Sequence, residues 1–382
     1  MSKTIIIIGA GLAGLSAALQ AAENGCNVKL VSSLPSERAQ SVMAEGGINA
    51  ALNTKDENDS PEEHFTDTIK AACGLADPNA VWGMTQAAPE LVHWLLKLGV
   101  KFNMSGYDDV DLRNFGGQKK KRTAFAQSDT GKQIMTAMID AVRRKEASGM
   151  VERFSHHSFL TLRLCGNICC GCVIRDEYSQ ETVELPGDAV IVATGGMHGL
   201  FGNTTGSLSN TGEVTAELFR LGVPLANGEM IQYHPTTVKC GGKRMLISEA
   251  ARGEGGRLFA MKDGKQWYFM EEKYPELGNL MPRDITAREI WKVSHESEVF
   301  LDMTEISEEI ISNKLSGLAD DCMTYLHKDI RKEPVSVLPG IHYFMGGILV
   351  DEQHRTPIQN LYAAGECCAQ YHGANRLGGN SL

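Results

Sequence analysis

The sequence predicts an α/β fold in which a parallel sheet carries a second, inserted α+β unit. Short apolar runs that end in glycine occur at 4–9, 188–196 and 361–366, and such junctions are typical of the carboxyl ends of parallel strands. Between Glu229 and His342 the alternation of strands and helices lapses, and polar clusters interrupt the chain. An inserted unit that covers one edge of the sheet explains this interruption.

The first junction has the pattern of a nucleotide-binding turn. An apolar strand at 4–8 is followed by Gly9, Gly11 and Gly14, and then by the helical pattern Leu15–Ala22. Glycines at this spacing let the backbone approach a pyrophosphate, which binds to the free N–H groups at the helix N-terminus. The apolar N-terminus is therefore not interpreted as a secretory signal, whose cleavage would remove these glycines.

The later junctions indicate which dinucleotide binds. The second expected strand, Asn27–Val31, is followed by Ser32, where an acid for the ribose is usual. The other two junctions end in Thr194-Gly195 and in Glu366. A cofactor that lies extended across one sheet, as FAD does, accounts for all three junctions, whereas NAD needs only the first. The alternative is that the later two are structural turns.

Composition excludes several classes of protein. Among 382 residues, 37 Lys and Arg stand against 47 Asp and Glu, and the net charge of -10 argues against nucleic-acid binding. No run of 18 apolar residues predicts a membrane span. Ten cysteines are scattered without a disulfide framework, which favours a reducing, cytoplasmic compartment.

Four of the cysteines lie close together, in the stretch CGNICCGC. Cys165, Cys169, Cys170 and Cys172 alternate with apolar residues, which favours a hairpin with buried thiols over a metal or cluster site. We expect no bound metal.

Ordered motifs run through the rest of the chain. They are AEGG at 44–47, FGGQ at 115–118, HPT at 234–236, SEAARGEGG at 248–256, PRD at 282–284, HYFMGG at 342–347 and HGANRLGGNSL at 372–382. With these motifs the chain resembles the flavoprotein subunits of fumarate reductase and succinate dehydrogenase, whose nearest cousin is L-aspartate oxidase. The resemblance implies a Rossmann-like FAD-binding domain at 1–227 and 343–382, an inserted α+β capping domain at 228–342, and the absence of the family's C-terminal helical domain.

The resemblance also implies the residues that contact FAD. Small residues in the AEGG loop let the backbone approach the flavin ring. The expected contacts are Gly9, Gly11, Gly14, Ser32, Ser41, Glu45, Gly46, Gly47, Thr194, Gly195, Glu213, Glu366, Ser381 and Leu382.

A small dicarboxylate substrate is a dianion, so its burial requires cations and donors at both ends. By resemblance, Arg376, His234, His342 and Ser248 hold the carboxylates. Phe115 is expected to pack near the carbon skeleton.

Reduction of fumarate needs a hydride on one alkene carbon and a proton on the other, and the flavin N5 supplies the hydride. By resemblance, Arg283 donates the proton and is fed by a relay through Glu249 and Arg252. Because a guanidinium normally stays protonated, the alternative is that Arg283 clamps the substrate and His342 donates.

Two other functions are weighed against fumarate reduction. L-aspartate oxidase must bind an ammonium, for which that family places an acid in the region where this chain has Phe115. Phe115 and Met345 match the fumarate and succinate enzymes, so aspartate oxidation is the alternative. A non-catalytic flavin-binding fragment is the other one, because the sequence stops at Leu382.

Electrons must come from another chain or a diffusible donor, because no haem or convincing cluster motif accompanies the flavin domain. The resemblance implies an iron-sulfur subunit as the donor. It also implies a cytoplasmic location, or a peripheral one at the inner face of the cell membrane, with membrane contact only through partner subunits. The basic run Lys119–Arg122 could assist docking, although a solvated loop is the favoured interpretation.

The residue Gln40 predicts how FAD is held. In membrane-bound members of the family, a histidine five positions before the loop carboxylate is joined covalently to the flavin, and counting back from Glu45 reaches Gln40. A carboxamide is a poor nucleophile, so we expect noncovalent FAD, a lower flavin potential and a bias toward fumarate reduction. The alternative linking residue is His64, in an expected helix from Pro61 to Ala72.

Overall fold

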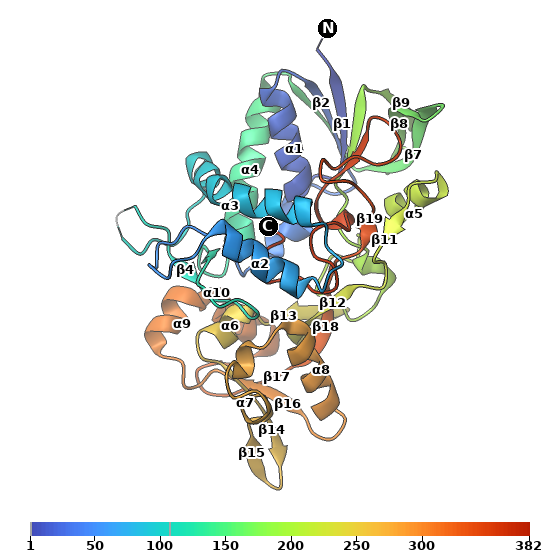
Figure 1. The fold of residues 1–382 in the computed structure, drawn as a ribbon. Helices are drawn as coiled ribbons and strands as arrows, with labels where there is room; N and C mark the ends of the chain where they lie inside the picture. The colour runs from blue at the N-terminus through green and yellow to red at the C-terminus, as the bar shows by residue number, and fades with distance from the viewer. Residues whose placement is uncertain (1, 107) are drawn as a thin grey trace.

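A five-stranded parallel sheet forms the centre of the larger domain (Figure 1). The computed structural model describes residues 2–106 and 108–382. The strand order is β20-β10-β1-β2-β6, and every neighbouring pair is parallel. The strands are β1 (Thr4–Ile8), β2 (Asn27–Ser32), β6 (Val151–Ser155), β10 (Ala189–Val192) and β20 (Leu361–Ala363). The predicted α/β fold is confirmed, since the three strands before the glycine junctions are neighbours in one sheet.

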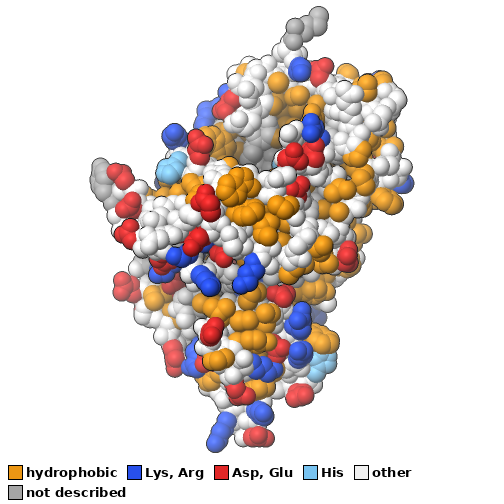
Figure 2. All heavy atoms as spheres, in the orientation of Figure 1, with side chains coloured by type: hydrophobic (Ala, Val, Ile, Leu, Met, Phe, Trp, Pro, Cys, Tyr) orange, Lys and Arg blue, Asp and Glu red, His pale blue; other side chains and the backbone are white. Residues whose placement is uncertain are grey.

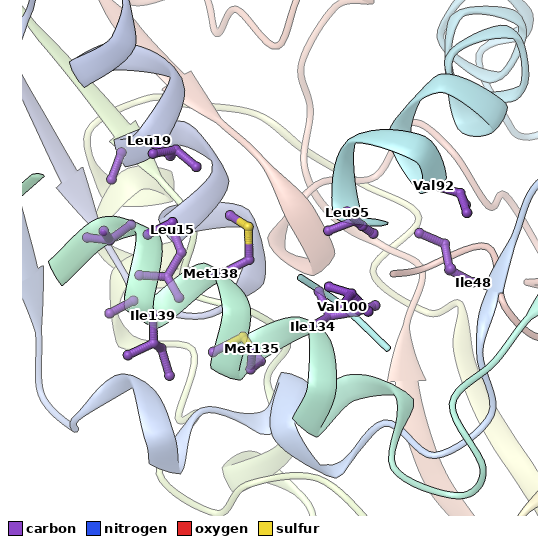
Figure 3. Packing of buried hydrophobic residues seen from close by; sticks show 14 of the residues in the cluster. Leu15, Leu19, Ile48, Val92, Leu95, Val100, Ile134, Met135, Met138 and Ile139 are labelled. Carbon is purple, nitrogen blue, oxygen red and sulfur yellow. The ribbon is translucent and has the colours of Figure 1, made fainter. Parts of the chain in front are cut away.

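Helices bury one face of this sheet. Helix α1 (Leu12–Glu23) packs against α4 (Thr130–Ala147), and Leu15, Met138 and Ile139 lie in one buried cluster between them (Figure 3). An all-parallel sheet needs apolar cover on both faces. The second cover is a three-stranded antiparallel sheet of β7 (His157–Cys165), β8 (Ile168–Asp176) and β9 (Thr182–Pro186).

Helix α1 begins at Leu12, earlier than the predicted Leu15. The reason is the close packing of Gly14, where an added Cβ would lie 1.9 Å from the carbonyl oxygen of Gly9. The first turn of the helix therefore rests directly on the end of β1, which only a glycine at this position allows.

Other elements complete the larger domain. The predicted helix at 61–72 is confirmed as α2, whose N-cap Ser60 accepts a hydrogen bond from the N–H of Glu63. The elements are α2 (Pro61–Ala71), α3 (Pro78–Leu98), α5 (Glu213–Arg220), β3 (Ile48–Asn49), β4 (Leu112–Arg113), β5 (Thr123–Ala124), β11 (Leu225–Ala226) and β19 (Gly347–Ile348).

A second hydrophobic core belongs to the inserted region. Apart from Phe115, its buried members come from Ile247 to Val337, and its elements gather at the end of the molecule opposite the N-terminus (Figure 1). Its strands are β12 (Ile231–Cys240), β13 (Lys243–Leu246), β14 (Arg257–Lys262), β15 (Lys265–Trp267), β16 (Val299–Asp302), β17 (Val335–Ser336) and β18 (Leu338–Phe344). Its helices are α6 (Glu249–Gly253), α7 (Phe269–Lys273), α8 (Arg283–Val293), α9 (Glu308–Lys314) and α10 (Ser316–Asp321).

The capping unit is thus α+β, with two sheets in the orders β13-β12-β18 and β15-β14-β16-β17. The second predicted domain boundary, at 342, falls inside β18. The boundaries themselves stay predictions.

In the described part of the chain, no helix has the length and apolar character needed to cross a membrane. Among residues 2–106 and 108–382, no group of three His, Cys, Asp or Glu side chains is arranged to hold a metal ion. On the face drawn in Figure 2, basic and acidic side chains of the described residues are interspersed.

Candidate active site

A cavity of about 450 Å³ runs from the carboxyl end of the parallel sheet to the capping unit. Its walls come from the ends of β1, β2 and β10 on one side, and from β12, α6, α8 and β18 on the other. Both domains therefore contribute to one site.

The turn between β1 and α1 is shaped for an anion. Gly9 has a φ of +112°, and an added Cβ there would lie 2.2 Å from the carbonyl oxygen of Ala193. Gly11 caps α1 without a side-chain hydrogen bond, and the first turn of the helix holds no acid. The N–H of Leu12 donates to Oγ of Ser41 at 3.3 Å. The remaining N–H groups of this turn are available to a pyrophosphate.

Two buried polar atoms in the cavity wall, Oγ of Ser32 and Oε2 of Glu45, have no hydrogen-bond partner among the described residues. Ser32 ends β2, at the place where a nucleotide ribose lies in this type of sheet. A bound dinucleotide would satisfy such atoms, so the residues present fit the predicted cofactor.

The structure brings the expected FAD contacts together, with the exception of Gly14. That glycine packs beneath the turn, against Gly9. Residues in the cavity wall are Gly9, Gly11, Ser32, Ser41, Glu45, Gly46, Gly47, Thr194, Gly195, Glu213, Glu366, Ser381 and Leu382.

The carboxylate of Glu366 is held by two donors. Its Oε1 accepts from the N–H of Phe344 at 3.0 Å and lies 3.2 Å from Nε2 of His198. His198 is fully buried, and its Nδ1 lies 2.9 Å from the hydroxyl of Thr204. The motifs alone carried no signal for this partnership, because His198 and Glu366 are far apart in the sequence.

The expected substrate residues also converge on the cavity. Residues in its wall are Phe115, His234, Ser248, Glu249, Arg283, His342 and Arg376. Arg252 is not in the wall; it lies fully buried behind Glu249, with its Nη2 3.5 Å from Oε1 of that carboxylate.

Arg283, the first residue of α8, forms a buried ion pair with Glu249. Its Nε and Nη2 lie 2.8 and 2.6 Å from Oε2 of Glu249, and Oε1 accepts from the N–H of Gly116 at 3.0 Å. Burial raises the pKa of Glu249, but Arg283 and Arg252 outweigh burial and hold that pKa below its usual 4.5. The carboxylate is therefore ionised and can accept a proton from one guanidinium and return it to another.

Gln232 is a site residue that the motifs missed. Its Oε1 accepts from Nη1 of Arg283 at 3.1 Å and from Nε of Arg376 at 3.2 Å, so one amide links the two arginines. Strand periodicity could have found it, because Gln232 and His234 are buried on β12 while Tyr233 between them is exposed.

The two histidines at this end are neutral. Their rings are 5.1 Å apart, and Nδ1 of His342 lies 2.8 Å from the hydroxyl of Thr205. Burial, followed by the charge of Arg283, holds the pKa of His234 and of His342 well below 6.5. Both can donate a hydrogen bond without carrying charge.

Arg376 supplies a second cation from the C-terminal loop. Its guanidinium lies 4.4 Å from the centre of the Tyr343 ring, and its Nη1 donates to the hydroxyl of Ser381. Burial, with the charge of Arg283, lowers the pKa of Arg376 to about 9. The two buried guanidiniums repel each other, and a dianion between them would relieve that repulsion.

Glu45 is an acid whose charge is suppressed. Burial, followed by the charges of Asp321 and Asp129, raises its pKa to about 8 from the usual 4.5. At neutral pH its carboxyl is therefore mostly protonated and can donate as well as accept a hydrogen bond.

His64 does not reach the cavity. It is buried, and its Nε2 lies 2.9 Å from Oδ1 of Asn380. Gln40, by contrast, lies in the cavity wall. His157 is also in the wall, beside Ser158 and Phe159.

The basic run is not a simple solvated loop. Arg122 is fully buried, with Nη2 2.8 Å from Oδ1 of Asp59 and Nη1 2.9 Å from Oδ2 of Asp67. Lys121 pairs with Glu57 at 3.7 Å. The solvated-loop interpretation is wrong for Arg122, because two distant acids fold onto it.

Comparisons with known proteins show the family to which the chain belongs. The family model for the FAD binding domain matches residues 4–382. The chain is 44% identical over 389 residues to the succinate dehydrogenase flavoprotein subunit of Bacillus subtilis, with 100% of this chain and 66% of that protein covered. It is 34% identical over 394 residues to the L-aspartate oxidase of Streptomyces coelicolor, with coverages of 100% and 66%.

A solved structure of a variant of the E. coli quinol fumarate reductase FrdA is also similar, with a TM-score of 0.91 and 30% identity. It covers 100% of this chain and 67% of its own. The chain thus spans about two thirds of the length of these relatives. With FAD-binding features along its whole length, the chain belongs to the family of FAD-binding oxidoreductases that contains the flavoprotein subunits of fumarate reductase and succinate dehydrogenase and the L-aspartate oxidases.

Proposed function

We propose that the chain interconverts fumarate and succinate with FAD, and that fumarate reduction is the favoured direction. The buried Arg283–Glu249 pair, open to the cavity among His234, His342 and Arg376, carries this proposal. The pair joins a guanidinium to an ionised carboxylate at the place where a dianion can bind.

Bound FAD supplies a hydride, and the chain positions the substrate to receive it. Arg376 neutralises one carboxylate, while His234, His342 and Ser248 donate hydrogen bonds. Because the imidazoles are neutral, the site adds donors without adding further mutually repelling charges. Phe115, which is buried, excludes water from the carbon skeleton.

Arg283 then donates a proton to the substrate carbon and recovers one from Glu249. Arg252 stands behind Glu249, and its Nε and Nη2 have no hydrogen-bond partner within residues 2–106 and 108–382. A proton on Arg252 can pass to Glu249 over the 3.5 Å between Nη2 and Oε1. The competing donor, His342, is disfavoured because its low pKa leaves it without an extra proton at neutral pH.

Fumarate is favoured over aspartate because the described part of the site offers no uncompensated anion beside Phe115. Glu249 is compensated by Arg283, and Glu45 is mostly protonated at neutral pH. An ammonium would therefore find no fixed negative charge there. Met345 is buried outside the cavity wall, so Phe115 is the residue on which this selectivity rests.

FAD is held noncovalently in this proposal. Gln40 stands in the cavity wall, and a carboxamide cannot replace an imidazole in a bond to the flavin. An iron-sulfur subunit is the proposed electron donor, and any membrane contact is made through such partners.

Anaerobic flavin spectroscopy tests the proposal. Dithionite-reduced, FAD-loaded protein should reoxidise rapidly when fumarate is added, and the Glu249→Gln variant should reoxidise far more slowly at the same FAD content. A matched sample with L-aspartate and oxygen reports the competing activity. Protein that holds FAD but is not reoxidised by fumarate, alone or joined to the remaining family segment, would contradict the proposal.

A further inference from the structure

Two thiols meet at the tip of the β7–β8 hairpin. A two-residue turn, Gly166-Asn167, joins the strands, with Cys165 opposite Ile168. The ladder shifts register between Arg163 and the next residue of β7, so that Cys170 is an extra, bulged residue. Sγ of Cys165 and Sγ of Cys170 lie 2.9 Å apart, about 1 Å more than the ~2.05 Å of a disulfide bond.

The bulge decides which thiols of the hairpin are accessible. Cys165 is exposed and Cys170 is half-buried, whereas Cys169 and Cys172 are buried. Burial raises the pKa of Cys172 to about 12, so its thiol is inert at neutral pH. The expectation of buried thiols therefore holds for Cys169 and Cys172 and is wrong for Cys165.

We infer that Cys165 and Cys170 form a dithiol site that a low-molecular-weight disulfide oxidises to an intramolecular disulfide. The exposed thiolate of Cys165 attacks one sulfur of the reagent, forms a mixed disulfide and releases one reagent thiol. The Cys170 thiolate then attacks the Cys165 sulfur and displaces the second reagent thiol. Two protein thiols lose two electrons and two protons, and the reagent disulfide is reduced to two thiols.

This site is separate from the flavin chemistry. The hairpin tip is hydrogen-bonded to the segment that precedes β20, through Cys169 N to Gln359 O at 2.8 Å and Gln359 N to Asn167 O at 3.0 Å. Neither Cys165 nor Cys170 lies in the cavity wall. Oxidation should therefore leave FAD content unchanged, so the inference can fail or succeed independently of the proposed function.

In the experiment, the FAD-loaded chain is incubated with oxidised glutathione under anaerobic conditions. After free thiols are alkylated, peptide mapping without reduction should find Cys165 and Cys170 joined, with a mass lower by two hydrogens. Cys73, an exposed thiol with no thiol neighbour in the described structure, is the internal control and should carry glutathione. Buried Cys367 and Cys368, 4.0 Å apart, should stay reduced.

The Cys170→Ser variant tests whether Cys165 goes on to form a disulfide because a second thiol lies beside it, or reacts only as an accessible thiol. Without the second thiol, Cys165 should accumulate as a stable mixed disulfide with glutathione. The inference is overturned if Cys73 is modified while Cys165 and Cys170 of the parent protein remain alkylated separately or each carry glutathione.

Discussion

Replacement of Arg283 by lysine or glutamine distinguishes a proton donor from a clamp. Lysine keeps a positive charge and an exchangeable proton but loses the planar fork of the guanidinium. Glutamine keeps hydrogen-bonding groups and loses the acid. If Arg283 donates the proton, the two variants should differ strongly.

The contacts set the size of the effect. Arg283 reaches Glu249 with two nitrogens, at 2.8 and 2.6 Å, and Gln232 with a third at 3.1 Å. Without the planar fork, we expect an ammonium to keep one of these two partners, and the lost bond costs about 1.5–3 kcal/mol, or roughly 10- to 150-fold in turnover. Glutamine should lose the acid as well, a further factor of roughly 10²–10⁴.

The assay is anaerobic fumarate turnover with a low-potential dye, measured between about pH 6 and about pH 10 at equal FAD content. A buried lysine loses its proton at a lower pH than arginine does. Turnover by the Arg283→Lys variant should therefore begin to fall at a lower pH than turnover by the parent protein, whose own decline is set by the loss of charge on Arg376 at a pKa of about 9.

Arg288, on the same helix, supplies the matched control. It is exposed and lies 4.0 Å from Asp284, so Arg288→Lys should leave turnover and its pH profile unchanged. If Arg283→Lys is as inactive as Arg283→Gln at every pH, the guanidinium acts as a clamp and the assignment of the donor is wrong.

Three further outcomes follow from the loop at 40–47 and the helix that packs against it. Acid precipitation should leave FAD in a yellow supernatant, because Gln40 cannot bond to it; a yellow pellet would contradict this. Burial raises the pKa of Glu45 from 4.5 to about 8, so the unfolding free energy should fall with rising pH between these values, by about 1.4 kcal/mol per pH unit. Glu45→Gln should remove that slope when denaturant unfolding is compared at about pH 5.5 and about pH 7.5; an unchanged slope would refute it. Gly131→Ala should displace the loop at 40–47, because the added Cβ would lie 2.1 Å from the carbonyl oxygen of Ser41. FAD binding should then weaken more than about tenfold in a fluorescence titration. Equal affinity of the variant and the parent protein would show that Gly131 does not position this loop for FAD.

Four strands of the parallel sheet, β1, β2, β10 and β20, could be predicted from the sequence, whereas β6 and the strand order were not predicted. Strands β1, β10 and β20 are short apolar runs followed by a glycine turn, and at Gly9 an added Cβ would lie 2.2 Å from the carbonyl oxygen of Ala193. These requirements are local, so residues within one short stretch report them. The start of α1 was misjudged because Gly14 was interpreted as a turn residue, and only its contact with Gly9 shows that it is already helical.

The sequence by itself also identified most side chains of the candidate site, because each stands in a short motif whose backbone positions it. The tertiary structure alone decided their charge states and partners. Gln232 joins Arg283 to Arg376, and His198 supports Glu366. Such pairings join residues far apart in the chain, and burial by distant elements shifts their pKa values, so no local pattern encodes them.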